Sequence, residues 1–578
     1  MTGRLKQIPI GNSDFGKIIQ EGQYYIDKTL LVKEILDSGA DISLITRPRR
    51  FGKTCNLSML KYFFEAEIPK SPSVLKVRSP QNNGKLFQDL AISRQGNEYM
   101  QHQGSYPVIF LNLKGAKAGN WQECYELLKE TIAQEYKNHD YLVKTNFLKG
   151  IDNKDFQQIV DVSASSTKYK KALQKLILYL SHYYEREVIV LIDEYDTPVH
   201  EAYENGFYKE IVDFLRTFLG EGLKDNTHVK KAVITGILRV TRENIFSDLN
   251  NPDIATLLSD KYANKFGFTE GEVKQFLQDY HLEDSFSEVK KWYNGYVIGK
   301  EQDIYNPWSI INYIDKHSEG FQAYWINTSR NTLINHLLAR SSQAVKSELE
   351  SLLEDKPIQK SINSYITFSD INRSSEALWS FLFFTGYLKV VEKILPEREG
   401  DEVEYLLTIP NLEVRTIYRK FVSEWFTDTI GVINISLLIK AILLGDSEVF
   451  EDILQDFVLK YISYYDVPEE ESEKVYHAFV LGLLIHSETH SLKSNRESGY
   501  GRYDILLLPK ESSLAGAILE FKRVRKNRKE TLEQACHVAL EQIENLKYET
   551  ELKELGVKTI HKYGIAFEGK RVLVLRGD

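Results

Sequence analysis

Short apolar runs alternate with longer amphipathic stretches in the first half of the chain. The runs lie at residues 41–46 (DISLIT), 107–113 (PVIFLNL), 187–192 (EVIVLI) and 231–235 (KAVIT). The stretches between them, for example 170–184, repeat apolar residues at helical spacing. Strands that are apolar at nearly every position are typical of parallel sheets with both faces covered. The pattern therefore predicts an α/β domain whose parallel sheet carries helices on both sides.

The middle of the chain changes pattern. Residues 268–345 have mostly helical spacing, and 373–409 reads as a helix, Gly386, a strand, a polar tip and a second strand. This order fits a winged helix. Three phenylalanines in that stretch, Phe381, Phe383 and Phe384, have the spacing of core residues, so we predict no base recognition there.

After residue 430, helical patterns dominate until a β-hairpin signal appears. YDILLL at 503–508 and AGAILEF at 515–521 are apolar runs separated by the turn PKESS. A helical pattern at 531–549 and a last strand near 562–567 complete a predicted small α/β unit.

Length and charge narrow the class of protein. A chain of 578 residues is long enough for several cores, and its net charge of −9 disfavours non-specific binding of the whole surface to nucleic acid. Cys55, Cys124 and Cys536 are too far apart in sequence to indicate a disulfide framework or a thiolate metal site. No apolar run approaches the roughly 18 residues of a membrane span. We therefore expect a cytoplasmic protein without a membrane partner.

The first candidate site follows the run at 41–46. RPRRFGKT (47–54) lies between a predicted strand and a predicted helix, where loop amides and a helix N-terminus can bind phosphate. Lys53 would reach the outer phosphates and Thr54 would hold Mg²⁺. Arg47 stands where the general motif has a glycine, and a basic loop that only caps a helix remains the alternative. The predicted nucleotide-binding residues of this loop are Arg49, Arg50, Phe51, Gly52, Lys53, Thr54 and Cys55.

A second part of the same site ends the run at 187–192. Asp193 and Glu194 follow this strand directly. A carboxylate at such a strand end can coordinate Mg²⁺ through water, and its neighbour can polarise an attacking water. Two solvated acids are the alternative, which the Gly-Lys-Thr loop disfavours.

The C-terminal hairpin predicts a separate acidic centre. Side chains alternate along a strand, so Glu520 and Lys522 share one face while Phe521 faces the core. Pairing of 503–508 with 515–521 would bring Asp504 close to Glu520. Two carboxylates and a lysine are suited to Mg²⁺-assisted phosphodiester hydrolysis. A strand with an ordinary solvated face is the alternative.

Three further features accompany this centre. Small and basic residues precede Asp504, and Gln542 and Tyr548 follow on the next predicted helix. A basic run follows the strand and offers a phosphate track, although such runs are usually solvated loops. It consists of Lys522, Arg523, Arg525, Lys526, Arg528 and Lys529. Glu473 is a candidate outer metal contact, and His477 is assigned a structural role.

Several of these segments are similar to one known family. RPRRFGKT, LIDEYDTPV (191–199) and ITGILRVTRENIFSDLNN (234–251) resemble the AAA-ATPase-like proteins that often carry a C-terminal PD-(D/E)XK nuclease domain. The same resemblance extends to GFT (267–269), WYNGY (292–296), YNPWS (305–309), YWINTS (324–329) and IPNLEVR (409–415). It implies nucleotide binding, accounts for Arg47, and places Thr235 as a sensor of the γ-phosphate. Arg239 or Arg242 would be candidates for transition-state charge, with a surface salt bridge as the alternative.

These features combine into one hypothesis with two competing interpretations. We predict a P-loop ATPase domain at 1–265, a helical and winged-helix-like region at 266–430, and a PD-(D/E)XK nuclease-like α/β domain at 431–578. The expected catalytic residues are Asp504, Glu520, Lys522, Gln542 and Glu194. The expected cofactors are ATP and Mg²⁺. Thr54, Asp193, Asp504 and Glu520 are expected to bind the metal, and Asp193 and Thr235 are also expected to contact the nucleotide.

The expected partner is nucleic acid, DNA rather than RNA. The sequence is compatible with a homo-oligomer and leaves the oligomeric state open. Conditional cutting would suit host defence or a mobile element. One alternative is a nucleotide-gated switch whose C-terminal domain binds nucleic acid or protein without cutting. The other is an ATPase whose nuclease-like part is purely structural.

Overall fold

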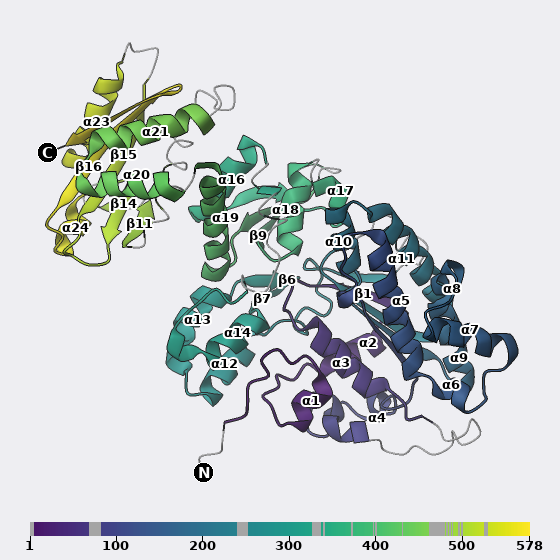
Figure 1. The fold of residues 1–578 in the computed structure, drawn as a ribbon. Helices are drawn as coiled ribbons and strands as arrows, with labels where there is room; N and C mark the ends of the chain where they lie inside the picture. Colours follow the sequence, from purple (N-terminus) through teal and green to yellow (C-terminus); the bar gives the residue numbers. More distant parts are fainter. Residues whose placement is uncertain are drawn as a thin grey trace. The chain divides into compact units, whose positions relative to one another are not determined.

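The apolar runs of the N-terminal half form adjacent strands of one parallel sheet in the computed structural model (Figure 1). In spatial order the strands are β2 (Val108–Asn112), β3 (Val188–Asp193), β4 (Val229–Gly236), β1 (Ile42–Thr46) and β5 (Asp253–Ala255). Every neighbouring pair is parallel, so the carboxyl ends of the strands meet at one edge. The four predicted strands are confirmed. The fifth, β5, has three residues, too few to give an apolar pattern.

The structure describes most of the chain and divides it into two units. The described ranges are 5–68, 82–239, 245, 252–325, 334, 337–338, 341–371, 374–396, 398, 402–430, 432–461, 480, 484, 487, 489–494, 497–498, 501–524 and 530–577. The first unit comprises Met1–Leu337 and Gln359–Val414, and the second comprises Leu338–Ile358 and Arg415–Asp578. The three-part division expected from the sequence stays a prediction.

Helices surround the parallel sheet. One face packs against α1 (Phe15–Gln20), α2 (Leu30–Asp37) and α3 (Lys53–Phe64) through a core that includes Leu57 and Val233. The other helices are α4 (Asn97–Met100), α5 (Trp121–Asn138), α6 (Tyr141–Lys144), α7 (Gly150–Val160), α8 (Ser166–Lys170), α9 (Ala172–Tyr184), α10 (Thr197–Asn205) and α11 (Tyr208–Leu223). The apolar strands are therefore buried in the interior of an α/β layer structure.

The rest of the first unit is helical with two small sheets. Its elements are α12 (Glu270–Asp279), α13 (Phe286–Tyr293), β6 (Tyr296–Ile298), β7 (Glu301–Ile304), α14 (Pro307–Asp315), β8 (Ile358–Ser361), α17 (Phe368–Ile371), α18 (Ser375–Phe384), β9 (Lys389–Ile394) and β10 (Glu404–Thr408). The predicted helix and strand pair around Gly386 are present as α18, β9 and β10. The winged-helix assignment stays a prediction. The hairpin of β6 and β7 interrupts the stretch expected to be mostly helical.

A buried carboxylate fixes the start of α19 (Leu412–Ile430). The side chain of Glu413 is fully buried and accepts hydrogen bonds from Ser309 Oγ at 2.7 Å and from the main-chain nitrogen of Trp325 at 2.8 Å. Burial raises the pKa of Glu413 to about 7, against the lowering effect of these hydrogen bonds. Ser309 belongs to α14, so one carboxylate joins two helices that are distant in sequence.

The second unit is built on a mixed sheet. Its strands in spatial order are β11 (His490–Ser494), β14 (Ile505–Pro509), β15 (Gly516–Arg523), β16 (Ile560–Glu568) and β17 (Arg571–Gly577). Strands β12 (Glu497–Ser498) and β13 (Gly501–Arg502) form a separate two-stranded antiparallel ribbon. The helices are α16 (Gln343–Leu353), α20 (Val432–Leu444), α21 (Ser447–Tyr461), α23 (Leu532–Asn545) and α24 (Thr550–Glu554), together with most of α19.

The predicted hairpin of the second unit is confirmed. Strands β14 and β15 are antiparallel, and β15 continues through α23 to the parallel strand β16. The strand expected to be the last is β16, and that expectation is wrong because β17 follows and pairs antiparallel to it. The predicted helix is also shorter, since α23 ends at Asn545. Within the described ranges, no helix combines the length and apolar composition needed to span a bilayer.

Candidate functional site

The loop between β1 and α3 turns sharply before the helix begins. Gly52 is the N-cap of α3 with a φ of +83°, and Arg50 has a φ of +68°. A Cβ on Gly52 would meet no atom within 4 Å, so its positive φ, and not lack of space, favours glycine. Residues with positive φ that alternate with ordinary ones, as Arg50 and Gly52 do on either side of Phe51, can point main-chain amides to a common side, as in anion-binding loops. The loop therefore has positive-φ residues of the kind found in phosphate-binding loops.

Arg47 does not face the ligand side of this loop. Its side chain is fully buried, and burial lowers the pKa of its guanidinium to about 9. The guanidinium donates hydrogen bonds of 2.8 to 3.3 Å to five main-chain carbonyl oxygens. These belong to Thr46, Ala255, Thr256, Lys261 and Tyr262. Arg47 thus fastens the end of β1 to the segment around β5, a structural role that the sequence did not indicate.

Three strand ends and the first turn of α3 converge on Asp193. This carboxylate is fully buried and accepts hydrogen bonds from Thr54 Oγ1 and Thr235 Oγ1, each at 2.7 Å. Asn112 Nδ2 donates to the same carboxylate at 3.1 Å. Burial raises the pKa of Asp193, and the two threonine hydrogen bonds oppose this effect. The structure brings together three residues expected from the sequence and adds Asn112, which ends the run at 107–113.

Lys53 and Glu194 lie beside this carboxylate. The ammonium of Lys53 donates to the carbonyl oxygens of Arg47 and Pro48, both at 2.9 Å, and only 6% of the residue is exposed. Burial lowers the pKa of Lys53, and the nearby acids oppose this shift, Glu194 most strongly. Glu194 itself adopts a φ of +51° at the end of β3. This strained conformation is typical of functional positions.

A cavity of about 320 Å³ opens over these residues. It is bordered by the predicted loop residues from Arg49 to Cys55 and by Glu194. The cationic side chains that border it are Lys28, Arg49, Arg50, Lys53, Lys114, Lys117 and Lys265, and the acidic ones are Glu194 and Asp196. Arg50 also stacks on the indole of Trp308 at 4.2 Å. Lys28 and Lys265 are paired with Glu272 and Glu34, and the other five cations still outnumber the two acids. This excess of positive charge favours a ligand with several negative charges, such as a polyphosphate.

Burial raises the pKa of Cys55 to about 12, so this lining residue is a neutral thiol. Cys55 therefore contributes packing contacts to the cavity wall and no charge.

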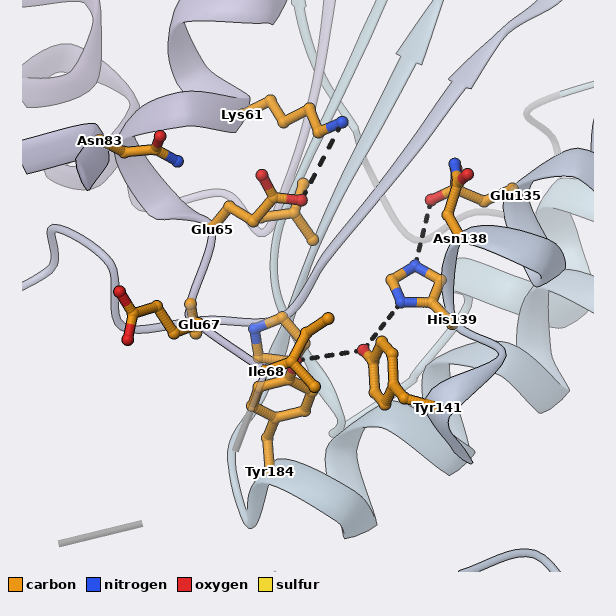
Figure 2. Close-up of a pocket in the computed structure, with 13 residues that line it drawn as sticks. Lys61, Glu65, Glu67, Ile68, Asn83, Glu135, Asn138, His139, Tyr141 and Tyr184 are labelled. Atoms are coloured by element: carbon orange, nitrogen blue, oxygen red, sulfur yellow. Dashed lines mark hydrogen bonds and ion pairs between the residues drawn. The ribbon is translucent and has the colours of Figure 1, made fainter. Parts of the chain in front are cut away.

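A second cavity of the first unit has the opposite charge (Figure 2). It has a volume of about 430 Å³, and its described lining includes three glutamates, Glu65, Glu67 and Glu135, against one lysine, Lys61. A chain of hydrogen bonds joins Glu135 to His139 at 3.3 Å and His139 to a tyrosine hydroxyl at 2.9 Å. These polar groups are already paired with one another. Their negative charge disfavours a polyphosphate, so this cavity is not the candidate nucleotide site.

The acidic centre of the second unit lies where β14 begins. Asp504 precedes this strand, and its carboxylate accepts a hydrogen bond from the main-chain nitrogen of Phe521 at 2.8 Å. Lys522 Nζ donates to Glu520 Oε1 at 2.9 Å, and the main-chain nitrogen of Asp504 lies 3.4 Å from Glu520 Oε2. Phe521 is fully buried on the other face of β15. The two carboxylates and the lysine therefore converge, in the arrangement expected from the alternation of the strand.

The charge of this centre suits a bound cation. Burial, followed by the negative charge of Asp504, raises the pKa of Glu520 to about 7 although Lys522 opposes the shift. A divalent ion would relieve this repulsion, and carboxylate oxygens are the ligands that Mg²⁺ prefers. Within the described ranges, no group of three or more His, Cys, Asp and Glu side chains is arranged to hold a metal. Such an ion would therefore keep several waters beside the two carboxylates.

Gln542 lies on α23 and donates to the hydroxyl of Tyr548 at 3.0 Å. Burial raises the pKa of Tyr548, and the charges of Glu520 and Asp504 also act on this hydroxyl. The pair therefore borders the acidic centre, with Gln542 bonded to a tyrosine and not to a carboxylate.

Some sequence expectations concern other places. Arg239 stacks on the ring of Tyr365 at 4.1 Å. The candidates Arg242, Glu473 and His477 lie outside the described residues. So does the basic run from residue 525 to 529, whereas Lys522 and Arg523 belong to β15.

Comparisons with known proteins match both parts of the chain. Residues 9–246 match the family model described as a predicted AAA-ATPase, and residues 471–576 match that of the PD-(D/E)XK nuclease superfamily. A similar protein is the "uncharacterized protein in vnfD 5'region" of Azotobacter chroococcum mcd 1. It is 27% identical over 413 residues, which cover 71% of this chain and 68% of that protein.

Proposed function

Because the chain combines an AAA-ATPase-like domain with a domain of the PD-(D/E)XK nuclease superfamily, we propose that it binds and hydrolyses ATP with Mg²⁺ and cuts DNA in a Mg²⁺-dependent reaction. The two domains support an ATPase combined with a nuclease-type hydrolase. DNA as the substrate, Mg²⁺ as the metal and control of cutting by the nucleotide are the proposal. Conditional cutting of this kind would suit host defence or a mobile element.

The first unit supports the nucleotide half of the proposal. Its cavity offers loop amides and cationic side chains for the phosphates, with Lys53 at the base of the loop. Thr54 and Asp193 are joined at 2.7 Å and would hold the Mg²⁺ of the ATP complex. Glu194 borders the cavity next to them and would orient the attacking water. Thr235 would sense the γ-phosphate through its bond to Asp193.

The second unit supports the nuclease half, and its acidic centre is the observation that carries the proposal. Asp504 and Glu520 would bind the metal, while Lys522 is 2.9 Å from Glu520 and would stabilise developing negative charge on the phosphate. When bound, Mg²⁺ supplies an activated water and neutralises charge on the scissile phosphate. The side chain of Glu520 is only 2% exposed. Burying its charge beside a second acid and a lysine costs desolvation free energy, which a bound metal ion would offset.

Cleavage and binding are measured separately to test this half. The full-length protein is incubated with single-stranded DNA, double-stranded DNA or RNA, with Mg²⁺ or with Ca²⁺ as a probe of metal binding, in each case with and without ATP. Asp504→Asn removes one metal-binding charge and is expected to abolish cleavage while leaving nucleic acid binding in place. Asp452→Asn, at an exposed position of α21, is the matched control and should cut like the wild type. Cleavage that survives Asp504→Asn would remove the catalytic assignment.

The same experiment separates the proposal from a nucleotide-gated switch. A switch would bind nucleic acid with an affinity that changes with ATP, and it would release no cleaved product at any Mg²⁺ concentration. Wild-type cutting that requires Mg²⁺ excludes the switch, and binding without cutting supports it.

A further inference from the structure

The segment after β4 is held by the residues that follow β3. Asp196 is 4% exposed, and its Oδ2 accepts hydrogen bonds from the main-chain nitrogens of Ile237 at 2.8 Å and Leu238 at 3.1 Å. The hydroxyl of the buried Tyr195 donates to the carbonyl oxygen of Leu238 at 2.5 Å. Two consecutive side chains thus bind both the amides and the carbonyl of the segment that leaves the sheet.

These contacts continue the one at the sensor position. Thr235 Oγ1 donates to Asp193 at 2.7 Å, and the main-chain nitrogen of Tyr195 donates to the carbonyl oxygen of Thr235 at 3.1 Å. Residues 193–196 and 235–238 are therefore joined at both ends. We name these contacts of Asp193, Tyr195 and Asp196 with residues 235–238 the strand-end clamp.

The close approach of residues 193–196 to residues 235–238 is visible at Gly236. A Cβ at this position would lie 2.6 Å from the ring of Tyr195 and 2.8 Å from Asp196 Oδ1. Both distances are shorter than real Cβ contacts, so a side chain here would push the clamp apart. The short distance between the two segments therefore requires glycine at position 236. The same close packing leaves the carboxylate of Asp196 little room to move.

We propose that Asp196 is a positioning residue of the ATPase site, which holds residues 235–238 so that Thr235 stays bonded to Asp193 during turnover. This inference rests on the proposed ATP hydrolysis. Asp196 also borders the cavity, so a direct role as metal ligand or base has to be distinguished. Its oxygen Oδ2 already accepts two amides. An oxygen so occupied is suited to fixing the main chain, so a direct role in proton transfer would fall to the other oxygen, Oδ1.

Asparagine and alanine at this position separate the two roles. Asp196→Asn keeps an oxygen acceptor for both amides, so we expect its kcat for ATP hydrolysis to stay within about threefold of the wild type. Asp196→Ala removes the acceptor and should lower kcat about tenfold or more, with a KM for ATP within about threefold of the wild type. If Asp196→Asn is as impaired as Asp196→Ala, the charge acts directly in the chemistry and the positioning role is wrong.

Two further variants keep the test open if Asp196→Ala does not fold. Tyr195→Phe removes only the hydroxyl that donates to Leu238, and Gly236→Ala inserts the clashing Cβ. Both should lower kcat with little change in KM. Normal turnover in both variants overturns the proposal.

Hydrogen exchange gives a readout that needs no ATPase activity. In the full-length wild type, the amides of Ile237 and Leu238 should be protected, and Asp196→Ala should speed their exchange about tenfold or more while Asp196→Asn preserves protection. Asp213→Ala, on the surface of α11, is the control and should leave these amides unchanged. Unchanged exchange in Asp196→Ala overturns the clamp.

The outcomes also separate this inference from the function on which it rests. A wild type that binds ATP without hydrolysing it overturns the proposed ATPase activity together with the role of Asp196 in turnover. An active wild type with an equally active Asp196→Ala overturns only the inference on Asp196.

Discussion

The buried carboxyl of Glu413 makes the stability of the first unit depend on pH in a defined direction. Burial raises its pKa from 4.5 to about 7 in the folded protein. The folded state therefore binds this proton more tightly than the unfolded state. Below pH 4.5 the group is protonated in both states, and above pH 7 it is ionised in both. Between these values its contribution to the free energy of unfolding falls as the pH rises.

The size of this effect follows from the two pKa values. One pKa unit corresponds to about 1.4 kcal/mol, so the charged form of Glu413 costs about 3 kcal/mol at high pH relative to the protonated form. Glu413→Gln is neutral at every pH and keeps an oxygen that can accept from Ser309 or from Trp325. The stability of the variant relative to the wild type should therefore increase by about 3 kcal/mol from pH 4.5 to pH 7.5.

Urea unfolding at several pH values measures this difference. The transition that contains the first unit is followed by tryptophan fluorescence, because Trp325 is bonded directly to Glu413. Glu301→Gln, at an exposed position of β7, is the matched control and should change stability equally at every pH. A difference between Glu413→Gln and the wild type that does not vary with pH would refute the reasoning.

Three further results are expected. Thr235→Val removes a 2.7 Å hydrogen bond to the buried Asp193 and should lower ATP turnover about tenfold in a steady-state assay, with Thr235→Ser restoring it. Arg47→Met removes a side-chain donor from five carbonyl oxygens, of which those of Thr256 and Tyr262 keep a main-chain donor, and should destabilise the first unit by about 1–3 kcal/mol in thermal unfolding; an unchanged Tm would contradict this. Binding of Mg²⁺ to the metal-free protein, followed by calorimetric titration, should strengthen as the pH rises through about 7, where Glu520 ionises, and Lys522→Met should move this rise to higher pH; a Mg²⁺ affinity that is flat from pH 6 to 8 would contradict both.

The sequence predicted the parallel sheet because its strands are largely apolar and its central strands are buried on both faces. All residues of β1 and β3 are buried, so they read as continuous apolar runs. The hairpin of the second unit was equally readable, since Glu520 and Lys522 alternate with the buried Phe521. Strands shorter than five residues, such as β5 and β6, carry too few positions to show either pattern.

Contacts between distant segments explain what the sequence could not predict. The guanidinium of Arg47 binds carbonyl oxygens more than 200 positions away, and main-chain acceptors leave no trace in side-chain identity. Asp196 holds two amides 41 and 42 positions away for the same reason. Both residues are charged and lie beside predicted site residues. From the sequence alone, such a side chain is expected to bind the ligand or is given no role. Burial distinguishes them, since each is less than 5% exposed.

The two sites differ in the sign of their charge, and this difference sets the order in which ligands can bind. At the cavity of the first unit cationic side chains outnumber acidic ones, so under the proposed function we expect an ATP anion to be attracted without a metal already bound there. At the acidic centre two carboxylates face one lysine, so above about pH 7, where Glu520 is ionised, we expect a phosphodiester to be repelled until a divalent cation has bound. Nucleic acid held near this centre without a metal would therefore lie away from Asp504 and Glu520. Under the proposed function we therefore expect the metal to bind at the acidic centre before the scissile phosphate does, and ATP to bind at its own cavity without such a prior step.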